Sequence, residues 1–362
     1  MAVITHLKRM DWILIGAALL MAALGLVSIY SSSSGNDFLN FEKQIAFLSA
    51  GFFLMIILSF LDWRTLREDP YLILFFYLLC VVALTGLFFF ASEIRGVKSW
   101  YKLGSLSVDP IEYIRIVLIV LLAKYFSMRH IEMYRIRHIL LSGFYVLLPA
   151  ILIFFQPNLG AVLILIALWV GTLLISGIKT RHFLLLCLLF LLIFILSWST
   201  LLKEYQKERI LTFIQPQVEP LGKGWSQAQA KIAIGSGGLT GQGIGRGSQT
   251  QYGFLSEPQT DFVFGALAEE TGLVGVGILL ILFSILVWRI IKIAITSQTN
   301  FPRLFAAGLA INLISQAFIH IGMNLGILPI IGIPLPLVSY GGSSLIANFI
   351  GFGILQSIKT RS

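Results

Sequence analysis

This 362-residue chain is poor in charge, cysteine and histidine. Charged residues make up only 12% of it, and its two cysteines, Cys80 and Cys187, both fall inside long apolar runs. Such cysteines give no disulfide framework and no metal-ligand spacing. The five histidines are scattered and form neither a zinc-type spacing nor a catalytic triad. These shortages argue against a disulfide-stabilised secreted domain and against a zinc enzyme.

Apolar residues dominate instead. They make up 57% of the chain, and the mean hydropathy is +0.90, outside the range of soluble domains. Helices and closed barrels are the structures that cross a bilayer, and spanning-length apolar runs recur along the chain. We predict an all-α polytopic membrane protein, one domain over residues 1–362. Its ten expected transmembrane helices are 12–31, 44–61, 71–91, 110–126, 137–155, 159–177, 183–201, 262–290, 303–326 and 340–358.

The distribution of basic residues predicts the orientation. Of the 26 Lys and Arg residues, fifteen lie at the termini or near the short loops that follow even-numbered spans. Both termini are therefore expected in the cytoplasm, and the large loop 203–260, between spans seven and eight, is expected outside. The net charge of +9 then reflects topology and attraction to anionic membrane lipids. It does not indicate a nucleic-acid partner.

The outer loop re-enters the apolar region through a lone acid, Asp261, in the sequence EPQTDFVF. An acid in the first turn of a helix also gains from the helix dipole, which is the structural alternative. A carboxylate at the membrane edge that faces a polar loop can act as a general base for a hydroxyl group. We therefore treat Asp261 as the candidate catalytic residue.

The same loop contains a glycine-rich stretch, Ile234–Gly247, with seven glycines. It matches neither the dinucleotide-binding nor the P-loop pattern. Its backbone N–H groups could form an anion nest, with Lys231 and Arg246 adding positive charge. The alternative is a flexible outer loop, but Gln, Ser and Thr are interleaved without low-complexity repetition, so we expect an ordered one.

A second polar group is expected inside the membrane. Glu112 and Arg115 are spaced i, i+3 on one face of the fourth span, which Asp109 is expected to cap. An intramembrane acid and base face the bundle interior or a wet cavity rather than lipid. Asn158, between spans five and six, is a candidate neighbour. The alternative to a substrate-binding role is a structural ion pair.

Near the C-terminus, three prolines precede the run Ser339–Ser344, which contains the candidate substrate-binding residue Ser343. Pro329, Pro334 and Pro336 forbid a regular helix. Non-helical backbone at membrane depth is tolerated where it is buried or lines a cavity. We predict a broken segment that faces the same outer cavity as Asp261. Tight helix packing is the alternative explanation for the glycines and serines.

Three blocks together resemble the SEDS family (shape, elongation, division and sporulation proteins). They are AIGSGGLTGQGIGRGSQ, LSEPQTDFVFGALAEETG and MNLGILPIIGIPLPLVSYGGSS. The resemblance covers the whole chain, and the last block is closer to the RodA-type branch than to the division branch. It departs at Asn158, where the family usually has Asp, and at Asp109 and Arg115, where it usually has Gln and Lys.

The resemblance implies a peptidoglycan glycosyltransferase of the bacterial inner membrane that polymerises lipid II for elongation and cell shape. It implies Asp261 as the base and a class B penicillin-binding protein as the partner transpeptidase. Joining an α-linked lipid diphosphate through a β-1,4 bond inverts the anomeric centre, so one base suffices. Cationic and amide groups would hold the diphosphate, and a divalent cation, Mg²⁺ or Mn²⁺, could assist although no ligand cluster is visible.

Two other functions remain open from the sequence. A flippase or transporter of the lipid-linked precursor would suit the intramembrane Glu112–Arg115 pair and the broken proline segment. The two halves of the chain show no internal repeat, however, and the largest polar element is one-sided. A membrane scaffold for wall-synthesis enzymes would not need Asp261.

Overall fold

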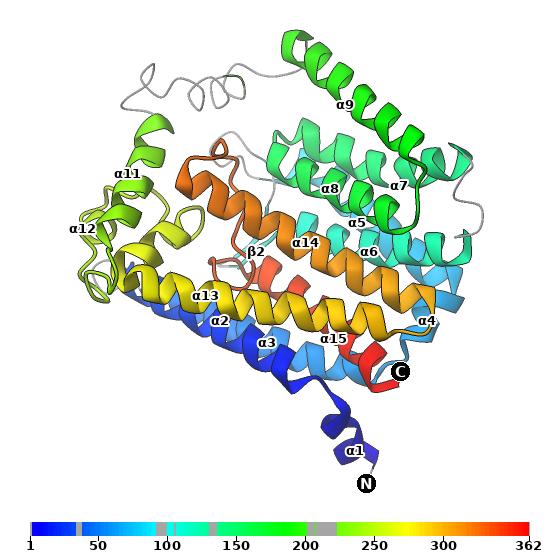
Figure 1. Cartoon of the computed structure of the whole chain (residues 1–362), viewed down its shortest axis with the longest axis horizontal. Coiled ribbons are helices and arrows are strands. Elements are labelled where there is room, and N and C mark those ends of the chain that lie inside the picture. The colour runs from blue at the N-terminus through cyan, green and yellow to red at the C-terminus, as the bar shows by residue number, and fades with distance from the viewer. Residues whose placement is uncertain are drawn as a thin grey trace.

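The computed structural model describes residues 2–33, 38–91, 100–104, 106–129, 136–200, 207 and 223–361. These residues form a bundle of helices (Figure 1). Helices lie at all ten predicted spans: α2 (Trp12–Ser31), α3 (Leu39–Phe60), α5 (Pro70–Phe90), α6 (Pro110–Arg129), α7 (Ile136–Phe155), α8 (Leu159–Ile175), α9 (Thr180–Thr200), α13 (Val263–Thr296), α14 (Asn300–Leu325) and α15 (Gly342–Arg361).

Seven of these helices, within the described residues, are long and apolar enough to cross a membrane: α2, α3, α5, α7, α9, α13 and α14. The helix α8 is apolar but has only 17 residues. Both α6 and α15 are more polar, and α6 carries the Glu112–Arg115 pair. The predicted all-α polytopic architecture is therefore confirmed.

Short elements join the long helices. On the side of the termini these are α1 (Ala2–Arg9) and α4 (Trp63–Glu68). A hairpin of β1 (Tyr101–Leu103) and β2 (Leu106–Val108) precedes α6, with Tyr101 opposite Val108. The outer loop contains α11 (Lys223–Ser236) and α12 (Ser248–Gln251). The hairpin and these two helices were not predicted from the sequence.

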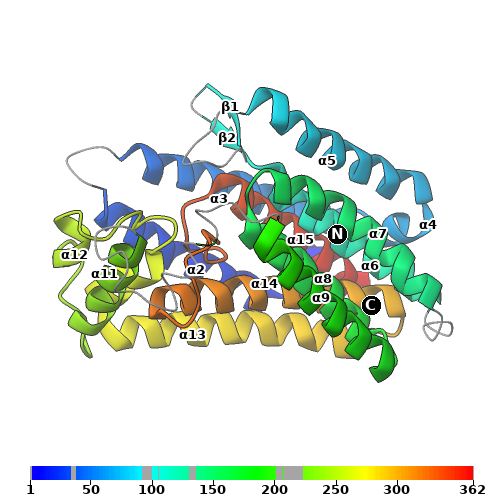
Figure 2. The same cartoon turned by 90° about the horizontal axis from the view of Figure 1, so that it is seen from above.

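The two ends of the bundle differ. Both termini lie toward one end, while α11 and α12 lie at the other (Figures 1 and 2). This arrangement is the one that the distribution of basic residues predicted, with the termini on one side and the large loop on the opposite side. The part of the 203–260 loop formed by residues 203–206 and 208–222 lies outside the described residues.

The centre of the bundle is built by α6, α14 and α15. The helix α14 packs against α6, α8 and α13, and α15 packs along α3. By contrast, α9 leans away from the bundle (Figure 1), and most of its side chains are exposed, as expected for a lipid-facing helix.

One predicted span needs correction. The predicted helix 262–290 extends to Thr296, and it is interrupted at Gly272, whose φ of 66° and ψ of −164° are not helical. The first part, Val263–Thr271, is separated from the longer second part by this kink. Glycine tolerates this conformation because it has no Cβ.

Candidate active site

The segment between α14 and α15 is non-helical, as the three prolines predicted. It starts at Gly326, a left-handed C-cap of α14 with φ 74°. Ile333 O and Leu335 N of this segment have hydrogen-bond partners. The His320 Nδ1 atom lies 2.7 Å from Ile333 O, and Ser339 Oγ accepts a hydrogen bond from Leu335 N at 2.9 Å. Buried backbone needs such partners at membrane depth.

This broken segment is wedged between helices. A Cβ on Gly25 of α2 would collide with Val338 O, so the glycine permits the close approach of the two backbones. A Cβ on Gly160 of α8 would lie 2.8 Å from Ile331 O. The segment is therefore held between α2 and α8, a placement that sequence spacing could not supply.

Asp261 lies where the outer loop meets this segment. It precedes α13 by two residues and is partly buried. The Asn324 side chain donates to Asp261 O at 3.0 Å, which ties the acid to the end of α14. Ser339 Oγ donates to the neighbouring Thr260 O at 2.7 Å. The carboxylate faces Gly332, because a Cβ on that glycine would lie 3.7 Å from Asp261 Oδ2.

Two buried acids of α13 hold the glycine-rich loop and the residues that directly follow it. The Glu269 carboxylate is fully buried and accepts from Gln249 N (2.7 Å), Thr250 N (3.0 Å) and Thr250 Oγ1 (2.8 Å). The Glu270 carboxylate accepts from Gly245 N at 3.2 Å and also from the hydroxyl of Ser31. The expectation of an ordered loop is confirmed.

The same contacts correct the anion-nest interpretation of this loop. Within Ile234–Gly247, Gly245 N donates to the Glu270 carboxylate, Gln242 N and Gly243 N donate to Glu269 O and Glu270 O at 3.0 Å, and Gly241 N donates to Gly237 O at 2.8 Å. These amides are engaged within the fold. They are therefore not the groups that would bind an external diphosphate.

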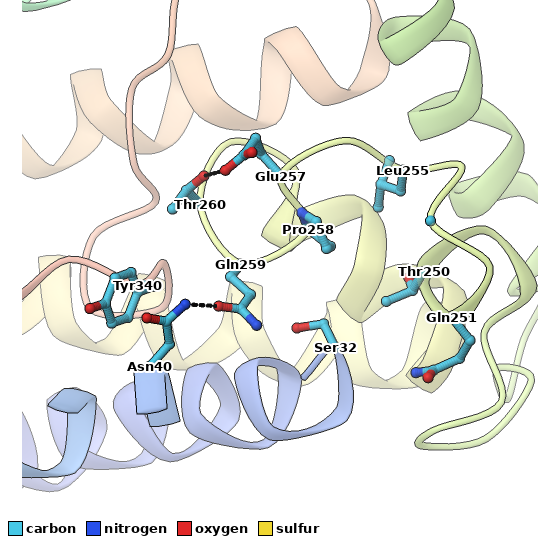
Figure 3. A pocket seen from close by; sticks show the side chains of 11 residues that line it. Ser32, Asn40, Thr250, Gln251, Leu255, Glu257, Pro258, Gln259, Thr260 and Tyr340 are labelled. Atoms are coloured by element: carbon cyan, nitrogen blue, oxygen red, sulfur yellow. Dashed lines mark hydrogen bonds between the residues drawn. The ribbon is translucent and has the colours of Figure 1, made fainter. Parts of the chain in front are cut away.

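A cavity of about 400 Å³ opens beside this region, between the outer ends of α2 and α3 and the loop that leads to Asp261 (Figure 3). Asn40 Nδ2 donates to Gln259 Oε1 at 2.8 Å across it, and Tyr340 N donates to Gln259 O at 2.7 Å. The side chains that line the cavity and can form hydrogen bonds are Ser32, Asn40, Thr250, Gln251, Glu257, Gln259, Thr260 and Tyr340.

Glu112 and Arg115 form a buried ion pair on α6. One guanidinium nitrogen, Nη1, lies 2.8 Å from both carboxylate oxygens, and the two side chains are 8% and 4% exposed. The prediction that they face the interior rather than lipid is confirmed. Asp109 caps the helix through Ile111 N at 2.9 Å, as predicted.

Ser343 joins this ion-pair region to α15. Its hydroxyl accepts a hydrogen bond from Asp109 N at 2.9 Å. Burial raises the pKa of the Asp109 carboxyl, and the nearby Glu112 carboxylate raises it further. The structure therefore brings the predicted residues Glu112, Arg115 and Ser343 into one cluster.

The other predicted binding residues lie in different surroundings. Asn158 caps α8 by accepting from Ala161 N at 3.2 Å. Lys231 of α11 is exposed, and its side chain passes over Gly326 at the C-terminal end of α14. Arg246 is exposed in the glycine-rich loop. A cation at the C-terminus of a helix is also favourable structurally, so the position of Lys231 does not by itself require a ligand.

Comparison with known proteins accounts for this arrangement. The family described as "cell cycle protein", which comprises FtsW, RodA and SpoVE, matches residues 11–362. The chain belongs to this family. The peptidoglycan glycosyltransferase MrdB of Escherichia coli K12 is 35% identical over 98% of this chain and 94% of its own length. Stage V sporulation protein E of Bacillus subtilis is 31% identical over 97% of both chains.

Solved structures agree with the family assignment. A chain of a solved peptidoglycan synthase complex, described as coordinating polymerization and crosslinking, matches with a TM-score of 0.82, at 32% identity over 97% of both chains. The rod shape determining protein RodA of Thermus thermophilus matches with a TM-score of 0.72, at 28% identity over 97% of this chain and 96% of its own. The protein is thus a RodA-type, multi-pass bacterial membrane protein.

One buried polar row of this FtsW/RodA/SpoVE chain was missed from the sequence. Asn312, Gln316, His320 and Asn324 follow one another at four-residue intervals along α14, and all are buried. Within the described part of the chain, Asn312 Oδ1, both polar atoms of Gln316 and His320 Nε2 have no hydrogen-bond partner. The four-residue spacing of polar groups in an apolar run was the signal that could have revealed it.

No group of three or more His, Cys, Asp or Glu side chains that could hold a metal ion occurs among the described residues. Mg²⁺ usually binds one or two protein carboxylates together with substrate phosphates, so a cation arriving with a diphosphate would need few ligands from the protein. The divalent cation stays a prediction, and no step below depends on it.

Proposed function

We propose that this chain is a peptidoglycan glycosyltransferase of the bacterial inner membrane. It polymerises lipid II into glycan strands that serve elongation and cell shape. The observation that carries the proposal is the position of Asp261 at the outer edge of the bundle, against Gly332 of the broken segment and next to a polar cavity. The activity in the names of its relatives, MrdB and the probable FtsW enzymes, supports it.

Asp261 acts as the general base in this proposal. Its carboxylate accepts the proton of the attacking sugar hydroxyl while the new C–O bond forms at the anomeric carbon. The lipid diphosphate leaves from the opposite face with the electrons of the broken bond, so the configuration inverts in a single displacement. No second carboxylate and no covalent enzyme intermediate are required. The ties of Asp261 to Asn324 and of Thr260 to Ser339 hold the base in place.

The diphosphate is assigned to cationic side chains rather than to loop amides. Lys231 and Arg246 are exposed cations on the outer segments of the chain. The buried cluster of Glu112, Arg115 and Ser343 supports the substrate site from the membrane side, with Asn158 on the neighbouring α8. Each of these residues can be mutated by itself, so each assigned role can be tested separately.

A class B penicillin-binding protein is the proposed partner. The matched synthase complex is named for the coordination of polymerisation and cross-linking. The described residues of this chain form a membrane bundle with short outer elements, and its glycan product needs a transpeptidase beside it to become cross-linked. The membrane helix of such a partner would pack on the apolar surface of the bundle.

The test is polymerisation of labelled lipid II by the purified full-length protein, with and without Asp261→Asn. The variant keeps the size and polarity of the side chain but removes the base, so the rate should fall by at least about 100-fold. Asp62→Asn, at an exposed carboxylate on the side of the termini, is the matched control and should keep the activity. Near wild-type polymerisation by Asp261→Asn would show that Asp261 is not the base. Precursor translocation without polymerisation by the wild type would support a flippase instead.

A further inference from the structure

The polar cavity beside Asp261 is lined by residues that are almost all uncharged. None of its eleven lining residues is Lys or Arg, and its one charged residue is the acid Glu257. A diphosphate would meet no positive charge there and would be repelled by the carboxylate. The cavity is therefore distinct from the cationic residues assigned to the leaving group.

The lining residues instead match a neutral, hydroxyl-rich molecule. The carboxamides of Asn40, Gln251 and Gln259 each carry two donor hydrogens and an acceptor oxygen. The hydroxyls of Ser32, Thr250 and Thr260 donate within the fold, to Ser28 O, Glu269 Oε2 and Glu257 Oε2, and their oxygens keep lone pairs that can accept. The ring of Tyr340 adds an apolar face with a hydroxyl at its edge. Sugar hydroxyls and N-acetyl groups are also both donors and acceptors.

The cavity is also connected to the base through the chain. Gln259 and Thr260 line it and directly precede Asp261. Both are fixed by the broken segment, through Tyr340 N to Gln259 O at 2.7 Å and Ser339 Oγ to Thr260 O at 2.7 Å. In Figure 3 the side chains of Asn40 and Gln259 meet across the cavity beside Tyr340. A sugar seated there would lie next to Asp261.

The backbone of the cavity wall has an unusual conformation at one residue. Glu257, in the cavity wall, has a φ of 52°, which is unusual for a residue with a side chain. Its carbonyl accepts from both Thr260 N and Phe262 N at 3.2 Å, and these bonds hold the turn. Such conformations persist where surrounding structure enforces them, and they concentrate at functional sites.

We infer that this cavity is a saccharide subsite that binds an N-acetylated sugar of the substrate through neutral hydrogen bonds. The sugar can come from the incoming lipid-linked disaccharide or from the end of the growing strand, which share this chemistry. The inference rests on the proposed glycosyltransferase function and names the part of the substrate that this cavity holds.

The experiment compares Asn40→Leu and Tyr340→Leu with the wild-type full-length protein in lipid nanodiscs. Two quantities are measured, the KM for lipid II and the length of the glycan product. Tyr252→Leu is the matched control, because Tyr252 is an exposed tyrosine of the same outer loop that does not line the cavity. We expect the two cavity variants to change one of the two quantities by about ten-fold, the effect of one or two lost hydrogen bonds. Tyr252→Leu should stay within two-fold.

Which of the two quantities changes, the KM or the product length, identifies the source of the sugar. A raised KM with normal product length assigns the cavity to the incoming disaccharide, and shortened products with a normal KM assign it to the growing strand. A soluble N-acetylated tetrasaccharide, without lipid or diphosphate, should also inhibit wild-type polymerisation, which covers a variant that fails to fold. Unchanged KM and length in both variants, or no inhibition by the tetrasaccharide, would overturn the subsite. Absence of polymerisation by the wild type would instead defeat the proposed function.

Discussion

The carboxylate of Asp261 faces Gly332, at van der Waals distance from the position that a Cβ would take there. A Cβ on this glycine would be 3.7 Å from Oδ2 and 3.9 Å from Oδ1, and its φ is +67°. The whole of α13 and the whole of α14 lie between the two residues in the chain, so their contact is created by the fold. It gives the broken segment a direct role in shaping the surroundings of the base.

Gly332→Ala is expected to lower activity by about ten-fold or more. The added methyl group would touch the carboxylate and exclude water from it, and the left-handed backbone adds a strain of about 1–2 kcal/mol. Gly177→Ala is the matched control, since Gly177 has a φ of +86° and no atom within 4 Å of its Cβ position. Both variants should lose similar thermal stability, but only Gly332→Ala should lose polymerisation. Equal activities would mean that this contact has no catalytic consequence.

The Glu112–Arg115 pair is expected to behave as a buried pair in a double-mutant cycle. Glu112→Gln or Arg115→Ala alone strands its partner at a site with little exposure, which costs about 3–5 kcal/mol. The double change should be less damaging than either single one. The exposed pair Asp62–Arg64, 3.4 Å apart, is the control and should couple by less than about 1 kcal/mol. Additive losses at Glu112 and Arg115 would contradict this account.

Glu269→Gln is expected to loosen α12, the short helix that directly follows the glycine-rich loop. The amide keeps the size of the side chain but places an NH₂ group against N–H donors, at a position that is fully buried. Each unsatisfied buried donor costs about 1–3 kcal/mol. Amide hydrogen exchange at residues 245–251 should speed up, and polymerisation should fall with it. Glu68→Gln, at an exposed acid of α4, should change neither.

Asp109→Asn is expected to stabilise the protein more at high pH than at low pH. Burial and Glu112 raise the pKa of Asp109, so its protonated form is favoured in the fold. The folded state is then most favoured below the unfolded pKa of about 4, and it loses that stability as pH rises through the folded pKa. Asn still caps the helix but does not ionise.

Melting temperatures measured from pH 5 to pH 8 check this. The advantage of Asp109→Asn over wild type should grow with pH to at least about 2 °C. Asp69→Asn, at the exposed N-cap of α5, controls for the change of capping group. A difference that stays constant, or that shrinks toward pH 8, would contradict the assigned direction.

The partner is expected to raise turnover. Its outer domain would contact the outer loop that frames Asp261, and a coupling free energy of about 1–3 kcal/mol corresponds to a 5–150-fold effect. Polymerisation is measured for the protein alone and in complex with its transpeptidase at matched concentration. Equal rates, with no co-purification from membranes, would remove the case for activation.

Much of this protein followed from its sequence, because the membrane imposes strong local constraints. Apolar length fixed where helices occur, prolines fixed where the last segment is broken, and basic residues fixed which end holds the termini. The i, i+3 spacing of Glu112 and Arg115 predicted their contact, since both sit on one helix. The position of Asp261, where the outer loop re-enters the apolar region, indicated it as the candidate catalytic residue.

Tertiary structure alone decided the rest, since it depends on contacts between residues far apart in the chain. Sequence patterns report local periodicity, and they do not show which backbone groups find which partners. The glycine-rich loop was interpreted as an anion nest, but the structure shows that Gln242 N, Gly243 N and Gly245 N donate to Glu269 and Glu270. The cavity is assembled from the ends of α2 and α3, the loop before α13 and the segment before α15. Only packing brings these four pieces together around Asp261.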